Sequence, residues 1–228
     1  MTTERGWLTF DCYGTLVDWR TGMEDALARV APARVADLLA GYHRAEPALQ
    51  QRRPLLSYRE VLRDGLLASA RELGIDVPDA LSTVLADTMP TWQPFAETAG
   101  VLRELRSAGW RLAILSNVDD DVIAQTLDLL GAPIDVVVTA EEVGSYKPDL
   151  GHFKEFRRRA RPVEGRWVHV ACSWFHDVLP AARAGVPSVF VDREREGRDP
   201  AQVVGVLPDL TGLPDTLASL DLPNQPRS

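Results

Sequence analysis

The chain has 228 residues, of which 45% are hydrophobic and 25% are charged, and its formal net charge at pH 7 is −8. These values are typical of a globular protein and exclude a fibrous or intrinsically disordered chain. The negative charge argues against nucleic acid as a partner, because phosphate binding needs clustered lysine and arginine side chains.

The first recognisable element is a short apolar strand, Trp7–Phe10, that ends at Asp11. Gly14 and Thr15 follow at once, which indicates a tight turn that aims one carboxylate out of a sheet edge. α/β enzymes place their chemistry at such an edge. A rigidly held carboxylate can act as a nucleophile and form an ester, with Thr15 and the backbone N–H groups around Gly14 as donors to it. The alternative is that Asp11 only caps a turn.

Residues 18–90 have the pattern of helices and of no strand. Apolar residues recur at steps of three and four, as in Ala26, Leu27 and Val30. We interpret four prolines as breaks between the helices: Pro32, Pro47, Pro54 and Pro78. A helical block inserted just after the first strand would lie over the carboxyl edge of the sheet, as a lid that excludes water and selects the substrate. The alternative is a helical decoration with no role in binding.

From Thr91 onward, expected helices and strands alternate. The strands are expected at 110–115, 135–139, 168–170 and 188–191, and the helices between them at 99–108, 122–130 and 178–184. Strands separated by helices of this length predict a parallel sheet with right-handed crossovers. The expected fold class is therefore α/β, with a Rossmann-like parallel sheet core formed by residues 1–17 and 91–228 and an inserted helical cap domain at 18–90.

Three further features bear on location and partners. The one basic run, KEFRRRAR at 154–161, is interpreted as the solvated face of a helix. Cys12 and Cys172 are too few for a disulfide scaffold, so we expect reduced thiols, although a redox link between two neighbouring strand ends stays open. No signal region and no stretch of membrane-span length is present, which predicts a cytoplasmic protein without a membrane partner.

The stretch Asp11–Leu16, DCYGTL, resembles the nucleophile motif of the haloacid dehalogenase superfamily. Three later stretches fall at expected strand ends and are similar to its other motifs in the required order. They are Ser116–Asn117, Lys147 in GSYKPD, and VACSWFHDVLPAARAG, which contains Asp177. The resemblance covers about residues 7–195 and implies an α/β core with a helical cap.

The resemblance also assigns roles. Asp11 is the nucleophile, Ser116 with its neighbours binds the anionic part of the substrate, and Asp177 helps to activate the hydrolytic water, with Ser173 beside it. A buried lysine next to a nucleophilic aspartate would hold that carboxylate ionised, which suits Lys147. Taken singly, each motif has a structural alternative, because Ser-Asn and Asp are common helix caps and Lys-Pro is a common loop.

Two positions separate this chain from the phosphatases of that superfamily. Tyr13 stands where most of them carry a second aspartate that protonates the leaving group, and Cys172 stands where they carry a metal-binding aspartate. Mg²⁺ prefers carboxylate oxygens. The remaining Asp11, Lys147 and Asp177 suit displacement of a group that leaves as an anion, such as halide, so no metal or other cofactor is expected.

The sequence is most similar to the metal-independent L-2-haloacid dehalogenases, and the expected reaction converts an (S)-2-haloacid to an (R)-2-hydroxy acid and halide through an aspartyl ester. Arg44 is the candidate for the arginine that the family's cap provides, with Arg20, Arg52 and Arg53 as substitutes. The expected substrate-binding set is Tyr13, Thr15, Arg44, Ser116, Asn117 and Ser173, with Tyr58 in the apolar wall. One alternative is a phosphatase that acts on a small phosphorylated metabolite with Mg²⁺, and another is a non-catalytic binding protein. The caps of this family commonly pair, so a homodimer is a further expectation.

Overall fold

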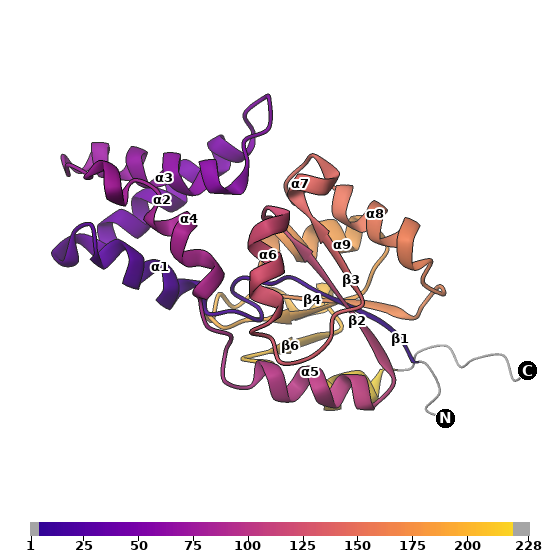
Figure 1. Cartoon of the computed structure of the whole chain (residues 1–228). Helices are drawn as coiled ribbons and strands as arrows, with labels where there is room; N and C mark the ends of the chain where they lie inside the picture. Colours follow the sequence, from indigo (N-terminus) through magenta and orange to yellow (C-terminus); the bar gives the residue numbers. More distant parts are fainter. Residues whose placement is uncertain (1–4, 221–228) are drawn as a thin grey trace, which may run out of the picture.

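The computed structural model of the protein describes residues 5–220. In this part of the chain six strands form one parallel sheet, in the order β3-β2-β1-β4-β5-β6 (Figure 1). The strands are β1 (Gly6–Phe10), β2 (Trp110–Ser116), β3 (Val136–Thr139), β4 (Trp167–Ala171), β5 (Ser188–Val191) and β6 (Gly205–Leu207). At the centre, Phe10 pairs with Ile114 of β2 and with Val170 of β4. The end of β1 therefore lies between the ends of β2 and β4.

Helices cover both faces of this sheet. The core helices are α5 (Thr98–Ser107), α6 (Asp120–Leu127), α7 (Ala140–Val143), α8 (Gly151–Ala160), α9 (Leu179–Arg183) and α10 (Leu213–Ser219). Leu8 and Phe10 lie in one buried cluster with residues of α5, α6 and α10, whereas Trp7 lies in a second cluster with residues of α8 and α9. This division follows from strand geometry, because successive side chains point to opposite faces. The result is the predicted Rossmann-like α/β fold.

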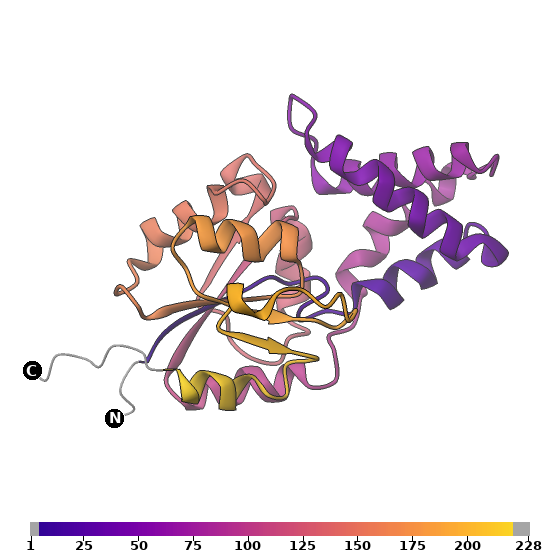
Figure 2. The same ribbon diagram turned by 180° about the vertical axis from the view of Figure 1, so that it is seen from behind.

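The helical insertion, residues 18–90, lies between β1 and α5 in the sequence. Its helices are α1 (Trp19–Ala28), α2 (Val35–Gln50), α3 (Tyr58–Glu72) and α4 (Val84–Thr88). Figures 1 and 2 show these helices gathered beside the edge at which the strands end. The Asp119 carboxylate, which follows β2, accepts the backbone N–H groups of Tyr58 at 2.8 Å and of Arg59 at 3.0 Å. These two bonds fix the start of α3 to the core.

The interpretation of Pro47 as a break between helices is wrong, because α2 continues from Val35 to Gln50 through it. A proline inside a helix removes one backbone hydrogen bond. Here it stands in the last turn of α2, and the helix is held by the burial of Leu38, Leu39 and Tyr42 upstream of it. The cost of the missing bond is offset by this packing.

The structure also bears on two further predictions, those for the basic run and for the two cysteines. The basic run lies on α8, with Phe153 and Phe156 buried and Lys154 exposed, as predicted for a solvated helix face. Cys12 and Cys172 are free thiols in this structure. Within residues 5–220, no helix has both the length and the apolar character that a membrane crossing requires.

Candidate active site

Asp11 follows β1 directly, and its side chain is held from two sides. Its Oδ2 accepts a hydrogen bond from the Thr15 hydroxyl at 2.9 Å, and its Oδ1 accepts one from Lys147 Nζ at 2.9 Å. The turn between Asp11 and Thr15 needs a glycine at position 14. Gly14 has φ +94°, and a Cβ there would lie 2.7 Å from Cys172 Sγ. The motif therefore fixes one carboxylate at the end of the central strand, as the sequence predicts.

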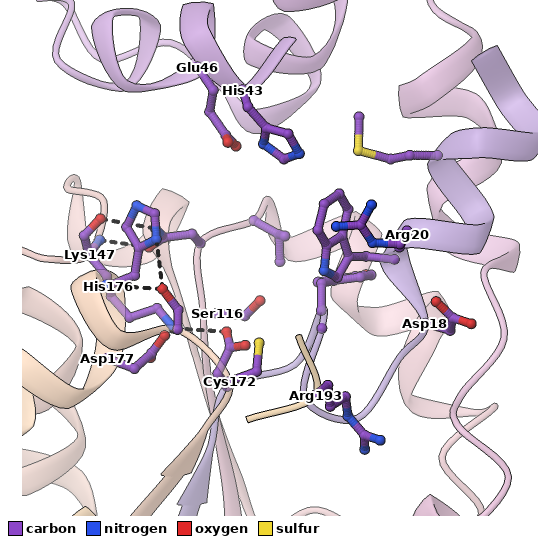
Figure 3. A pocket seen from close by; sticks show the side chains of 18 of the residues that line it. Asp18, Arg20, His43, Glu46, Ser116, Lys147, Cys172, His176, Asp177 and Arg193 are labelled. Atoms are coloured by element: carbon purple, nitrogen blue, oxygen red, sulfur yellow. Dashed lines mark hydrogen bonds and ion pairs between the residues drawn. The ribbon is translucent and has the colours of Figure 1, made fainter. Parts of the chain in front are cut away.

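Lys147 lies in the middle of the site and is 1% exposed. Its three N–H donors reach Asp11 Oδ1 at 2.9 Å, Asp177 Oδ1 at 2.6 Å and the Leu115 carbonyl at 2.8 Å. Figure 3 shows Lys147 and Asp177 on the core side of the cavity. The side chain of Asn117 holds the backbone of this lysine, through Oδ1 at 2.7 Å from its N–H and Nδ2 at 3.1 Å from its carbonyl. Asn117 thus positions Lys147, a role that the sequence interpretation did not assign to it.

The charges of the site are coupled through Lys147. Burial lowers the pKa of Lys147, but the carboxylates of Asp11 and Asp177 outweigh burial and hold that pKa above its ordinary value. Burial raises the pKa of Asp177, but Lys147 and His169 together hold it below its ordinary value. Burial keeps the pKa of Asp11 raised, against the attraction of Lys147. The ammonium group therefore stays charged and is shared by two carboxylates.

A buried chain of hydrogen bonds supports Asp177 from behind. Trp167 Nε1 donates to Thr9 Oγ1 at 2.8 Å, Thr9 Oγ1 lies 2.9 Å from His169 Nδ1, and His169 Nε2 lies 3.1 Å from Asp177 Oδ1. His169 Nε2 faces a carboxylate, so it carries the proton and Nδ1 accepts from Thr9. Sequence analysis missed His169, and the one available signal was a histidine inside an otherwise apolar strand.

Three residues that line the cavity have a buried polar atom without a hydrogen-bond partner in the described part of the chain: Asp177 Oδ2, Ser116 Oγ and Arg193 Nε. The first two belong to residues predicted for the site. A buried polar atom without a partner is costly. These two atoms are therefore suited to contact water or substrate. The alternative role of Asp177 as a helix cap is wrong, because the cap at that turn is Ser173, whose Oγ accepts the backbone N–H of His176 at 3.1 Å.

The cavity has a volume of about 540 Å³ and lies between the core and the helical insertion. The core contributes the predicted Tyr13, Asn117 and Ser173 to the lining, in addition to Asp11, Ser116, Lys147 and Asp177. Tyr13 donates or accepts one hydrogen bond with Thr126 at 2.7 Å, and burial raises its pKa, so it remains a neutral phenol. The insertion contributes the predicted Tyr58.

The insertion also contributes Glu46 and His43, which sequence analysis did not single out, and Figure 3 shows both extending toward the core side of the cavity. Arg20, named above as a substitute for Arg44, lines the cavity as well. His176 lines the opposite side, and burial lowers the pKa of its imidazole, which therefore stays neutral at pH 7.

Two of the predicted substrate contacts need correction. Arg44 lies outside the cavity: its side chain is 56% exposed and pairs with Glu72 of α3 at 2.8 Å. Thr15 is fully buried and does not line the cavity; it donates to Asp11 and accepts the backbone N–H of Cys172 at 2.9 Å. Thr15 therefore positions the nucleophile instead of binding the substrate.

The residues present do not fit a magnesium ion. Cys172 stands beside Asp11 at the end of β4, and burial raises the pKa of its thiol, which therefore stays protonated. A neutral thiol is a poor ligand for a hard cation that selects oxygen. Within residues 5–220, no group of three or more His, Cys, Asp or Glu side chains is arranged to hold a metal ion. Metal independence itself stays a prediction.

Comparisons with known proteins agree with this geometry. The (S)-2-haloacid dehalogenase of Pseudomonas sp. (strain YL) is 26% identical over 192 residues, which is 82% of each chain. The L-2-haloacid dehalogenase structure from Xanthobacter autotrophicus has a TM-score of 0.81 at 21% identity, covering 96% of this chain and 100% of that one, a likeness that establishes the fold alone. A glyceraldehyde 3-phosphate phosphatase from Methanothermobacter thermautotrophicus is 36% identical over 104 residues, 45% of this chain and 46% of that one. The family model of haloacid dehalogenase-like hydrolases matches residues 7–185, so the chain belongs to that family.

Proposed function

We propose that the protein is a hydrolytic dehalogenase that converts an (S)-2-haloacid to an (R)-2-hydroxy acid and halide through an ester on Asp11. The observation that carries the proposal is the arrangement of Lys147 between Asp11 and Asp177, with Asp177 Oδ2 left without a partner. A nucleophile, a fixed positive charge and an acceptor for a water proton are the groups that such a reaction needs.

In the first step, a carboxylate oxygen of Asp11 attacks C2 of the substrate from the side opposite the halogen. The C–O bond forms as the C–halogen bond breaks, and its electron pair leaves with the halide. The halide needs no proton, which agrees with the neutral phenol of Tyr13 where an acid would otherwise stand. Attack from behind inverts the configuration at C2. The reaction moves one negative charge from the carboxylate to the halide and creates none.

In the second step, water attacks the carbonyl carbon of the Asp11 ester. Asp177 Oδ2 takes the proton from that water, and Lys147 stabilises the negative charge that develops on the ester oxygen. The ester C–O bond then breaks, and the hydroxy acid leaves with the proton that Asp177 took. The second proton of the water leaves the Asp11 carboxyl for solvent, so that Asp11 is again a carboxylate carrying an oxygen from water. Two groups facing the cavity are suited to hold the substrate carboxylate: the Ser116 hydroxyl, which lacks a partner, and His176 Nε2.

The same family contains phosphatases, and the partial similarity to a glyceraldehyde 3-phosphate phosphatase makes phosphate ester hydrolysis the second candidate. Phosphoryl transfer needs a cation that neutralises the transferring group, and usually an acid for the leaving oxygen. Tyr13 and Cys172 stand where those carboxylates would be, which disfavours this candidate. A non-catalytic binding protein is disfavoured by the buried ion pairs of Lys147, because two carboxylates around one cation are costly to maintain.

Release of halide from (S)-2-chloropropionate, measured beside release of phosphate from p-nitrophenyl phosphate, tests the proposal. We expect chloride release by the wild-type protein and none by Asp11→Asn, which is nearly isosteric but a poor nucleophile. The Thr126→Val variant is the control for a neighbouring change, since Thr126 contacts Tyr13 and not the nucleophile. Phosphate release without chloride release would overturn the proposal in favour of the phosphatase.

A further inference from the structure

We propose that the wall of the cavity formed by the helical insertion binds a positively charged ammonium group of the substrate, held between the Glu46 carboxylate and aromatic rings. The inference rests on the proposed function, because it specifies which 2-haloacids the enzyme takes. They are zwitterions with the carboxylate and the reacting carbon at the core and a quaternary or other ammonium group at the opposite end.

Glu46 is placed to receive such a group. Its Oε1 accepts three hydrogen bonds, from Tyr42 at 3.1 Å, Gln50 at 3.2 Å and Tyr58 at 3.3 Å. Its Oε2 has no hydrogen bond or ion pair within residues 5–220, and Figure 3 shows the carboxyl group directed into the cavity from α2. Three donors thus fix the carboxylate and leave one oxygen for a ligand.

The charge of the cavity favours a cation. Seven carboxyl groups line it, against three basic side chains, Arg20, Lys147 and Arg193. Each base is already paired: Arg20 with Glu194 at 2.7 Å, Arg193 with Glu97 at 2.7 Å, and Lys147 with two aspartates. The lining has no basic side chain left over, and clefts lined by one sign of charge concentrate ligands of the opposite sign.

Aromatic rings line the same part of the cavity. Trp19 packs edge-on against the ring of His43, with centroids 5.2 Å apart, and Tyr42 and Tyr58 donate to the Glu46 carboxylate. Trp19, His43, Tyr42 and Tyr58 all line the cavity together with Glu46. The Trp19 ring already has a cation over it, the Arg20 guanidinium at 5.7 Å from its centroid. Aromatic rings beside a carboxylate are the surroundings that bind alkylammonium groups, through cation–π attraction and ion pairing. Burial raises the pKa of Glu46, and a bound cation would reverse that shift.

The size of the cavity also exceeds the needs of a three-carbon acid. Its volume of about 540 Å³ lies within the range of roughly 300–1,000 Å³ that accommodates drug-sized ligands. A small haloacid at Asp11 would leave the space below α2 filled with water. A chain that ends in an ammonium group would fill this space and reach Glu46. The chemistry at Asp11 is unchanged by this group.

Binding of choline, compared with its uncharged carbon isostere 3,3-dimethyl-1-butanol, tests the subsite without turnover. Isothermal titration calorimetry of the wild-type protein should give binding of choline at least about 10-fold tighter than of the isostere. Glu46→Gln keeps the shape and removes the charge, and it should weaken choline binding by roughly 10- to 100-fold. The matched control is Glu72→Gln, whose exposed carboxylate lies outside the cavity and pairs with Arg44; it should bind choline like the wild type. Thermal unfolding verifies that both variants are folded.

Turnover separates this inference from the proposed function. Chloride release is measured with 2-chloro-6-(trimethylammonio)hexanoate and with its isostere 2-chloro-7,7-dimethyloctanoate, whose tail ends in a neutral tert-butyl group, and the substrate with the ammonium group should have the higher kcat/KM. If choline binds through Glu46 but no chlorinated acid releases chloride, the dehalogenase proposal is wrong and the subsite stands. If 2-chloropropionate is hydrolysed but choline binds no better than its isostere, or binds equally well to Glu46→Gln, the ammonium subsite is wrong and the dehalogenase proposal stands.

Discussion

Replacing Lys147 with methionine is expected to destabilise the protein in a pH-dependent way. Methionine has a similar length and volume, so the change removes a charge without opening a large cavity. The lysine is 1% exposed and lies between Asp11 and Asp177, both of which lie within 3 Å of its ammonium nitrogen. Removing one partner from a buried ion pair leaves charge without compensation and typically costs about 3–5 kcal/mol.

The pH dependence follows from proton counting. In Lys147→Met, two buried carboxylates face each other without a cation, so one of them takes up a proton in the folded state at neutral pH. In the unfolded chain, aspartate is deprotonated above about pH 4. The folded variant then binds one proton more than the unfolded chain, and its free energy of unfolding falls by about 1.4 kcal/mol for each pH unit.

The wild-type site contributes less slope than the variant over the same range, because Lys147 opposes the rise that burial causes in the pKa of Asp11. The depressed pKa of Asp177 adds stability that is lost only as the pH falls below the ordinary aspartate range, and the raised pKa of Lys147 adds stability that is lost only far above neutral pH. Urea unfolding at pH 6, 7 and 8 should therefore show a difference between wild type and Lys147→Met that grows with pH. Lys154→Met, an exposed change on α8, is the matched control. A loss smaller than about 1 kcal/mol at pH 8, or one independent of pH, would refute the assignment of Lys147 as the shared counter-ion.

Four further predictions concern the reaction. Single turnover in water enriched in oxygen-18 should place the label on Asp11, as read by mass spectrometry of its peptide, whereas label entering only the product would contradict an ester intermediate. Chloride release should persist in excess chelator, and loss of activity restored by Mg²⁺ would favour the phosphatase. Arg44→Ala should leave kcat/KM within about two-fold, since its exposed ion pair contributes little; a larger loss would return Arg44 to the site. His169→Asn should raise the pKa of Asp177, moving the acid limb of the kcat profile up by about one to two pH units, and an unmoved limb would contradict a role for His169.

The core of the site could be predicted because polar residues at strand ends stand out against apolar strands. Asp11 follows such a run and Ser116 ends one, and a parallel sheet brings strand ends to one edge. Lys147 instead lies in the loop after α7, and only the family resemblance indicated it. The strands were predicted within two residues of their observed bounds, except β6, Gly205–Leu207, which is short, partly exposed and lies at the edge of the sheet. Three residues carry too little periodicity to be recognised.

The hydrogen bonds that support Asp177 could not be predicted from polar residues at strand ends. His169, Thr9 and Trp167 lie on β1 and β4, and the register of two parallel strands decides which of their side chains meet. Thr9 pairs directly with His169 in that register. The sequence contains the residues, but the partner of a buried histidine is set by the pairing of strands 160 positions apart in the chain.

The error at Arg44 has a different origin, namely the phase of α2. An α-helix turns by about 100° per residue, so residue 44 lies about 200° from residue 42 and residue 46 only about 40° from it. Tyr42 is buried against α3, which places Glu46 on the inward face and Arg44 on the outward one. Arg44 was assigned from the family resemblance and not from the phase of this helix, although residues 38–46 all precede Pro47 and already define that phase. The periodicity that places Arg44 on the outward face of α2 also places the Glu46 carboxylate at the cavity.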